Sequence, residues 1–329
     1  MDIVIPLATG IGENLELKYA LRSIDKNLSG YNRIFIVSDV LPSWAQGVQL
    51  IKAKDNHLHN KDANIIDKVK KACTEIKDLS DVFLFWSDDQ ALLKPCKCSE
   101  ITPVYSTLTP DLTEDSTWRR RLRNTIEYLT KQNKSGTHWD SHVPQPYSKK
   151  LFIQVMDQVS YQTEPGFAIN TLFFNYIGEK PIVQKDTVKC TVEEKVDDLK
   201  FHEQVESARW IGYNDTGWKQ CVKTFFERVF TKSKYEKEKT EMELLKMKEH
   251  TVMSMKKLHS VLRKPYMVVG LMDSILSYLP QLEPQYNLIL HKIKKLPVEQ
   301  RNDKTKLNLL CAKIYAETRT TLWKVITTN

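Results

Sequence analysis

Hydrophobic runs alternate with amphipathic stretches along residues 1–90 of the chain. Apolar runs rich in β-branched and aromatic residues predict strands at residues 2–6, 33–37, 48–51 and 81–86, and helical spacing predicts helices at residues 14–28 and 64–76. Gly30 ends the first of these helices. Strands that alternate with helices indicate an α/β domain whose sheet is largely parallel. Because such sheets bind ligands beyond the carboxyl ends of their strands, we expect the site in the loops after Ile5, Val37 and Trp86.

The pattern after residue 90 is less regular. It predicts helices at residues 118–129 and 149–159, strand-like segments at 167–176 and 182–188, and a short mixed segment at 204–213. Near Tyr235 the sequence becomes dense in charge, and helices interrupted by prolines are predicted at residues 236–263, 266–278, 285–295 and 303–326. We therefore expect a first domain over residues 1–235 and a small, basic, all-α C-terminal region over residues 236–329.

The composition is that of an ordinary globular protein, with 41% hydrophobic and 27% charged residues among 329. No apolar run reaches the ~18 residues of a membrane span, and no secretory signal is visible at the N-terminus. Among the six cysteines only Cys96 and Cys98 lie close together, which is too few for a typical zinc site. These features predict a cytoplasmic protein without a membrane span, located in the host cytoplasm if a phage encodes it.

Positive charge is concentrated in the last third of the chain. Residues 231–329 contain 19 Lys and Arg against 10 Asp and Glu, so this segment carries +9 while the whole chain carries +8. A basic appendage on a nearly neutral domain suggests a polyanionic partner such as DNA. A solvated lysine-rich helical face, or a dimerising one, would have the same composition, and the oligomeric state stays open.

Two adjacent carboxylates, Asp88 and Asp89, follow the most hydrophobic of the predicted strands. Like charges this close repel each other, and a divalent cation relieves that repulsion. Mg²⁺ and Mn²⁺ bind carboxylates together with the phosphate oxygens of a substrate. Ser-Asp-Asp also occurs in turns and helix caps, so a structural role is the alternative.

Further polar residues fall at or near predicted strand ends. Asp39 follows the second strand and could accept hydrogen bonds from a nucleotide, while Arg22 on the first helix could reach a phosphate. Asp140 and His142 lie two residues apart in a segment that a nearby proline favours as extended, and either could act as a general base, or His142 as a metal ligand. Asp215 lies in a polar turn. A turn or a surface ion pair is the structural alternative for each.

Taken in order, these motifs resemble two known groups of enzymes. Residues 16–24 (ELKYALRSI), 33–39 (RIFIVSD) with Pro42 and Trp44, and 83–89 (FLFWSDD) resemble the Stealth sugar-phosphate transferases. They resemble still more closely the phage glycosyltransferases associated with DNA base hypermodification, which continue with similar segments at residues 64–72, 142–144, 214–215 and 225–235. The resemblance covers about residues 1–236. It implies a GT-A-like (Rossmann-like) mixed sheet with helices on both faces.

The resemblance also implies roles for individual residues. Asp88 and Asp89, with His142, would bind Mn²⁺ or Mg²⁺ and the diphosphate, and Asp140, His142 and Asp215 would complete the catalytic centre. The donor, a nucleotide diphosphate sugar and most readily a UDP-sugar, would be bound by Pro6, Gly10, Arg22, Asp39 and Lys68. One departure favours the phage group: the turn after the first strand is Pro-Leu-Ala-Thr-Gly at residues 6–10, where Stealth proteins carry an acidic Asp-Gly-Ser-type turn.

The leading hypothesis is therefore a metal-dependent glycosyltransferase that moves a sugar to a hydroxymethyl base in DNA, with the C-terminal region binding DNA. One alternative is a Stealth-type sugar or sugar-phosphate transferase that acts on a surface glycan. The other is a non-catalytic nucleic-acid-binding protein on a GT-A fold, since fold alone does not determine function. The sequence leaves the sugar, the acceptor base and the stereochemical outcome open.

Overall fold

The computed structural model describes residues 1–10, 13–105, 111–113, 115–139, 142–180, 189–192 and 198–238. Its first compact unit spans Met1–Lys237. The strand predicted at residues 182–188 and the helices predicted beyond residue 238 lie outside the described residues. The division at residue 235 and the all-α C-terminal region therefore stay predictions.

A five-stranded sheet forms the centre of this unit. Its strands are β1 (Ile3–Pro6), β3 (Ile34–Ser38), β4 (Gln49–Lys52), β5 (Val82–Phe85) and β8 (Gln145–Ser148), in the order β4-β3-β1-β5-β8. The first four are parallel, with Ile3 opposite Ile34 on one side and Leu84 on the other, and β8 is antiparallel at the edge. The prediction of a largely parallel sheet is confirmed. Strand β8 was not predicted, because Pro146 at its second position disguises an edge strand.

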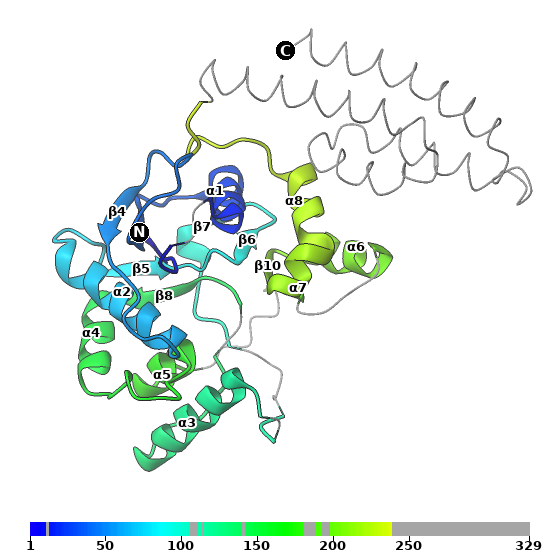
Figure 1. Ribbon diagram of the computed structural model, residues 1–329. Helices are drawn as coiled ribbons and strands as arrows, with labels where there is room; N and C mark the ends of the chain where they lie inside the picture. The colour runs from blue at the N-terminus through cyan, green and yellow to red at the C-terminus, as the bar shows by residue number, and fades with distance from the viewer. Residues whose placement is uncertain are drawn as a thin grey trace, which may run out of the picture. The chain divides into compact units, whose positions relative to one another are not determined.

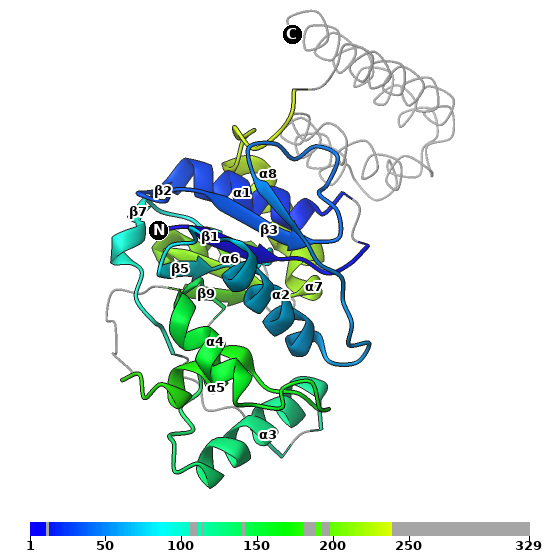
Figure 2. The ribbon, with the colours of Figure 1, turned by 90° about the vertical axis from the view of Figure 1, so that its left-hand side faces the viewer.

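Helices cover both faces of the sheet, as Figures 1 and 2 show. One face packs on α2 (Lys61–Glu75), α4 (Lys149–Asp157) and α5 (Ile169–Tyr176), with α3 (Thr117–Lys131) beyond them, and the other packs on α1 (Leu15–Asn27). Alternation along each strand produces this arrangement: Val4 and Phe35 point into the first core, and Ile3 and Ile36 into the second. The predicted α/β class, a mixed sheet with helices on both faces, is confirmed.

Two predictions about helices need correction. Helix α2 begins at Lys61, three residues before the predicted start, because the Asn60 side chain caps it by accepting a hydrogen bond from the Ala63 N–H. The segment predicted as a strand at residues 167–176 is mostly the helix α5. Seven of its eight residues are buried, including the polar Asn170, Thr171 and Asn175, so the helix has no exposed polar face. Periodicity therefore cannot distinguish this short segment from a buried strand.

A second, smaller sheet brings the later part of the chain to the site. It consists of β6 (Gln90–Leu92), β10 (Trp210–Tyr213) and β9 (Lys189–Val192), in the order β6-β10-β9. The remaining elements are β2 (Leu28–Ser29), β7 (Cys96–Lys97), η1 (Cys98–Glu100), α6 (Asp198–Ser207), α7 (Asp215–Gly217), η2 (Trp218–Val222) and α8 (Lys223–Val229). Since β6 starts directly after Asp89 and β10 ends directly before Asn214, their antiparallel pairing brings these segments together. None of the helices described is both long enough and apolar enough to cross a lipid bilayer.

Candidate functional site

A cavity of about 760 Å³ opens at the carboxyl ends of the parallel strands. Five residues predicted from the sequence line it: Pro6, Lys68, Asp88, Asp89 and Asp215. They come from the end of β1, the middle of α2, the turn after β5 and the start of α7. The cavity therefore lies where the α/β topology predicts a ligand site.

One wall of the cavity consists of carboxylates. Asp88 and Asp89 occupy the turn between β5 and β6, Asp215 begins α7, and Glu16 projects from the first turn of α1. The Tyr213 N–H donates to the Asp89 carbonyl at 3.2 Å, which holds the two chain segments together. Asn14 donates from Nδ2 to Asp88 Oδ2 at 2.9 Å while its Oδ1 caps α1. These bonds fix the backbone of the acidic wall.

The acidic wall perturbs the groups inside it. Burial, followed by the charges of Asp88, Asp89 and Asp215, raises the pKa of Glu16 to about 7. Burial and the charges of Glu16, Asp89 and Asp88 also raise the pKa of Tyr213 well above its ordinary value. Both shifts have the direction expected where the electrostatic potential is negative. A bound cation would reduce this negative potential.

The described residues contain no group of three or more His, Cys, Asp or Glu placed to hold a metal ion. Mg²⁺ and Mn²⁺ do not need such a group, since they commonly take one or two carboxylates and complete their coordination with substrate phosphates and water. Asp88 and Asp89 supply hard oxygen donors on the wall of an open cavity. The acidic wall therefore fits a divalent cation that binds together with a phosphorylated ligand.

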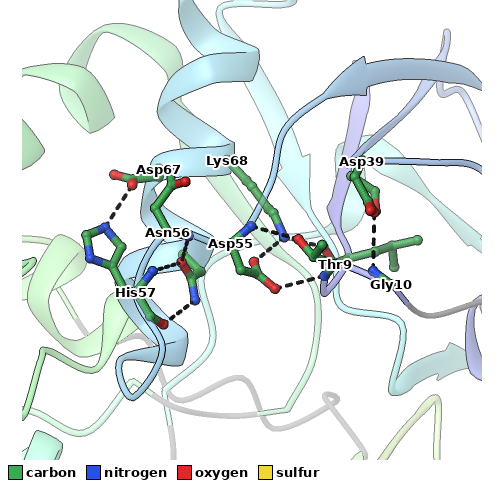
Figure 3. Close-up of polar contacts among 11 residues, drawn as sticks. Thr9, Gly10, Asp39, Asp55, Asn56, His57, Asp67 and Lys68 are labelled. Carbon is green, nitrogen blue, oxygen red and sulfur yellow. Dashed lines mark hydrogen bonds and ion pairs between the residues drawn. The ribbon is translucent and has the colours of Figure 1, made fainter.

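Lys68 lines the cavity, and its side chain connects two segments of the chain there (Figure 3). Its ammonium group donates to the Leu7 carbonyl and pairs with Asp55, and its side chain is 2% exposed. Asp55 in turn accepts a 2.8 Å hydrogen bond from the Thr9 N–H. Burial would raise the pKa of Asp55, but the Lys68 and Thr9 hydrogen bonds outweigh it and lower the pKa. Lys68 thus ties the loop after β1 to α2, which shapes the floor of the cavity.

Asp39 and Gly10 lie together beside the cavity and are not among its lining residues. The Gly10 N–H donates to Asp39 Oδ1 at 3.3 Å (Figure 3). Gly10 has a φ of 77°, a left-handed backbone conformation that glycine adopts without strain. The two residues therefore stabilise the loop after β1, and their predicted contact with the donor stays a prediction.

Arg22, predicted to bind the donor, lies outside the cavity lining. Its guanidinium forms a two-point ion pair with Glu236, with both N–O distances 2.7 Å, and a third bond reaches the Phe230 carbonyl. Lys18 also approaches Glu236 at 3.3 Å. Burial would raise the pKa of Glu236, but hydrogen bonds from Arg22 and Ser233 outweigh it and lower the pKa to about 2. Arg22 thus anchors the end of the first unit to α1.

His142 also lies outside the cavity lining, and Asp140 lies outside the described residues. His142 has a φ of 50° and packs against β10. A Cβ at Gly212 would lie 2.5 Å from the Cβ of His142, so the glycine allows this close approach. His142 is therefore not among the lining residues, and its role as a metal ligand or catalytic residue stays a prediction.

Sequence reasoning did not single out three of the chemically important lining residues: Glu16, Tyr213 and Arg121. Glu16 had a signal, since it lies in the first turn of a helix that directly follows the loop after β1. Tyr213 and Arg121 had none, because they reach the cavity through the packing of β10 and α3.

No protein-family model and no curated protein matches the sequence. Among solved structures, the chain is similar to an active-site mutant of LgtC. The TM-score is 0.42 and the sequence identity 13%, over 70% of this chain and 94% of that chain.

Proposed function

We propose that this protein is a glycosyltransferase that binds a nucleotide diphosphate sugar in the cavity and transfers the sugar to a hydroxymethyl base in DNA. The observation that carries the proposal is the convergence of Asp88, Asp89 and Asp215 on one wall of the cavity. Asp215 is far from Asp88 and Asp89 in the sequence, and all three are among the residues to which the resemblance to the phage glycosyltransferases assigns the metal, the diphosphate and the catalytic centre.

The size of the cavity supports a ligand of this kind. Its volume of about 760 Å³ lies within the roughly 300–1,000 Å³ usual for small-molecule sites. Its lining combines the acidic wall with the short apolar segment Pro6, Leu7 and Ala8 at the end of β1. A nucleotide sugar offers matching features: a diphosphate for a cation on the acidic wall, and a flat base for the apolar segment.

The residues of the acidic wall would have two roles, metal binding and proton transfer. Asp88 and Asp89 would hold Mn²⁺ or Mg²⁺, which neutralises the charge that develops on the departing diphosphate. Asp215, exposed at the start of α7, is open to an acceptor that enters from solvent. It would take the proton of the acceptor hydroxyl as the new bond to the sugar forms and the bond to the diphosphate breaks.

The charge of residues 231–329 supports DNA as the acceptor. A segment with 19 Lys and Arg against 10 Asp and Glu attracts polyanions and releases counterions when it binds phosphates. Such a segment would raise the concentration of DNA around the protein.

The test is release of nucleoside diphosphate from a panel of sugar donors with Mn²⁺ or Mg²⁺ present. Hydroxymethylated DNA, plain DNA and no acceptor are compared, with Asp89→Asn as the control variant. We expect release that requires both the metal and hydroxymethylated DNA and that Asp89→Asn abolishes. Metal-dependent release that is indifferent to DNA would retain the glycosyltransferase and reject the DNA acceptor. If no donor binds or turns over, the non-catalytic alternative replaces the proposal.

A further inference from the structure

A second group of polar residues in the cavity lining consists of basic side chains and comes from different elements. His59 lies in the loop before α2, Lys61 is the first residue of α2, and Arg121 projects from α3. All three line the cavity that also contains the acidic wall. Neither the motifs nor the resemblance assigned a role to any of them.

Three of the four arginines of α3 occupy two different environments. Arg120 and Arg123 lie near Asp115 outside the cavity lining, with N–O distances of 3.7 Å and 3.4 Å, and the Asp115 side chain is 71% exposed. Arg121 instead lines the cavity, and its side chain is 11% exposed. The one helix thus presents ordinary surface arginines and one nearly buried arginine in the cavity wall.

Arg121 is only weakly neutralised by the protein around it. Its Nη1 lies 3.6 Å from Asp62 Oδ2, and within the described part of the chain its buried Nε has no hydrogen-bond partner. A buried guanidinium N–H without an acceptor is costly, and such groups are rare in folded proteins. An anion in the cavity would give the terminal N–H groups of this guanidinium a closer acceptor than Asp62, and a phosphate matches the planar donor fork of arginine.

We propose that His59, Lys61 and Arg121 form a phosphate-binding wall, with Arg121 as its main donor. This inference rests on the proposed function and extends it: a ligand in the cavity has one anionic group at the cation held by Asp88 and Asp89 and a phosphate contact at Arg121. The phosphate belongs either to the diphosphate of the donor or to the DNA acceptor. Arg121 is accordingly a positioning residue for the anionic part of the substrate.

The test measures binding by the full chain and by three variants in the presence of Mn²⁺. UDP, uridine and a hydroxymethylated DNA oligonucleotide are titrated into the wild type, Arg121→Gln, Lys61→Gln and Arg120→Gln. Arg120→Gln is the matched control, because it removes an arginine of the same helix whose side chain is 50% exposed outside the cavity.

We expect Arg121→Gln to weaken binding of a phosphate ligand about 10- to 100-fold, the value of a charge-assisted hydrogen bond. Lys61→Gln should weaken it about threefold, because its exposed ammonium is better solvated. Arg120→Gln should leave binding unchanged, and uridine should bind every variant equally. Weaker UDP binding assigns the phosphate to the donor, and weaker DNA binding with unchanged UDP binding assigns it to the acceptor. Equal affinity of wild type and Arg121→Gln for both ligands overturns the proposal.

Two further measurements apply if Arg121→Gln does not fold or if the wild type binds no nucleoside diphosphate. In the first case, Arg121→Lys and the exposed Lys61→Gln replace Arg121→Gln, and unchanged phosphate binding in both overturns the proposal. In the second case, the proposed function fails, and inorganic pyrophosphate alone becomes the probe. Pyrophosphate binding that Arg121→Gln weakens keeps the phosphate-binding wall, and binding that is absent or unchanged rejects it.

Discussion

Two glutamates, Glu16 in α1 and Glu236 paired with Arg22 of α1, have opposite electrostatic environments. Glu16 faces the three aspartates of the acidic wall, and its pKa is raised to about 7. Glu236 is 6% exposed and lies between Arg22 and Lys18, and its pKa is lowered to about 2. The first cluster carries an excess of like charge in an open cavity, whereas the second is closed and its charges are paired.

The comparison shows how to separate a binding site from a structural ion pair when both contain charged residues. A closed cluster with matched charges has no unpaired charge left for a ligand, so its role is structural, and removing one partner of the cluster is destabilising. An open cluster with unmatched charges is destabilising until a ligand of opposite charge arrives. The sequence predicted Arg22 and Asp88 both at the donor and its metal; Arg22 lies in the closed cluster and Asp88 in the open one.

The largest expected effect concerns the acidic wall. Asp88→Asn and Asp89→Asn should each reduce turnover about 10³-fold or more, because the metal loses a carboxylate that stabilises the leaving group. Neither change should lower the free energy of unfolding, since each removes one of several repelling charges. Turnover assays and urea unfolding of the same preparations would check this. A variant that loses stability in proportion to activity would show that Asp88 and Asp89 stabilise the fold and do not act in catalysis.

The Arg22–Glu236 cluster should respond in the opposite way. Arg22→Met removes the two-point partner of the buried Glu236 carboxylate and leaves it Lys18 and the hydrogen bonds from Ser233. This should cost about 3 kcal/mol of unfolding free energy. UDP affinity per folded molecule should stay at the wild-type value.

Urea unfolding and nucleotide titration measure the two quantities for Arg22→Met. Lys71→Met is the matched control, because it breaks the exposed 2.8 Å pair with Glu75 and should cost no more than about 0.5 kcal/mol. If Arg22→Met lost UDP affinity but kept its full stability, Arg22 would contribute to donor binding.

The smallest expected effect is a pH dependence of stability that arises from Glu16. Because the folded-state pKa of Glu16, about 7, exceeds its ordinary value of 4.5, the folded protein keeps a proton that the unfolded chain releases. Stability should therefore fall as the pH rises from about 4.5 to 7. Glu16→Gln lacks this titration and should be more stable than the wild type by about 1 kcal/mol at pH 8, after allowance for solvent screening, and equal to it near pH 4.

Thermal unfolding of the wild type and Glu16→Gln across this pH range would test the linkage. Added Mn²⁺ should reduce the difference between the two proteins at pH 8, because a cation on the acidic wall offsets the same repulsion. A difference between them that does not change with pH would show that Glu16 is not coupled to the aspartates.

The order of apolar and polar residues was enough to predict the class of the fold and one edge of the site. Period-two and helical apolar patterns are local properties, so they located β1, β3, β4, β5, α1 and α2 closely enough to establish a parallel sheet. A parallel sheet brings the carboxyl ends of its strands to one edge, and this placed Pro6 and the pair Asp88 and Asp89 at the cavity.

Which charges face each other could be learned only from the folded chain. The partner of Arg22 is Glu236, 214 positions away, and Arg121 reaches the cavity because α3 packs beside the N-terminal turn of α2, where Asp62 meets it. Helix α5 was misread for a related reason, since a segment buried on all sides loses the polar face that identifies a helix. Secondary structure follows from interactions between neighbours in sequence, whereas charge pairing and burial depend on contacts between distant segments, and these exist only after the chain has folded.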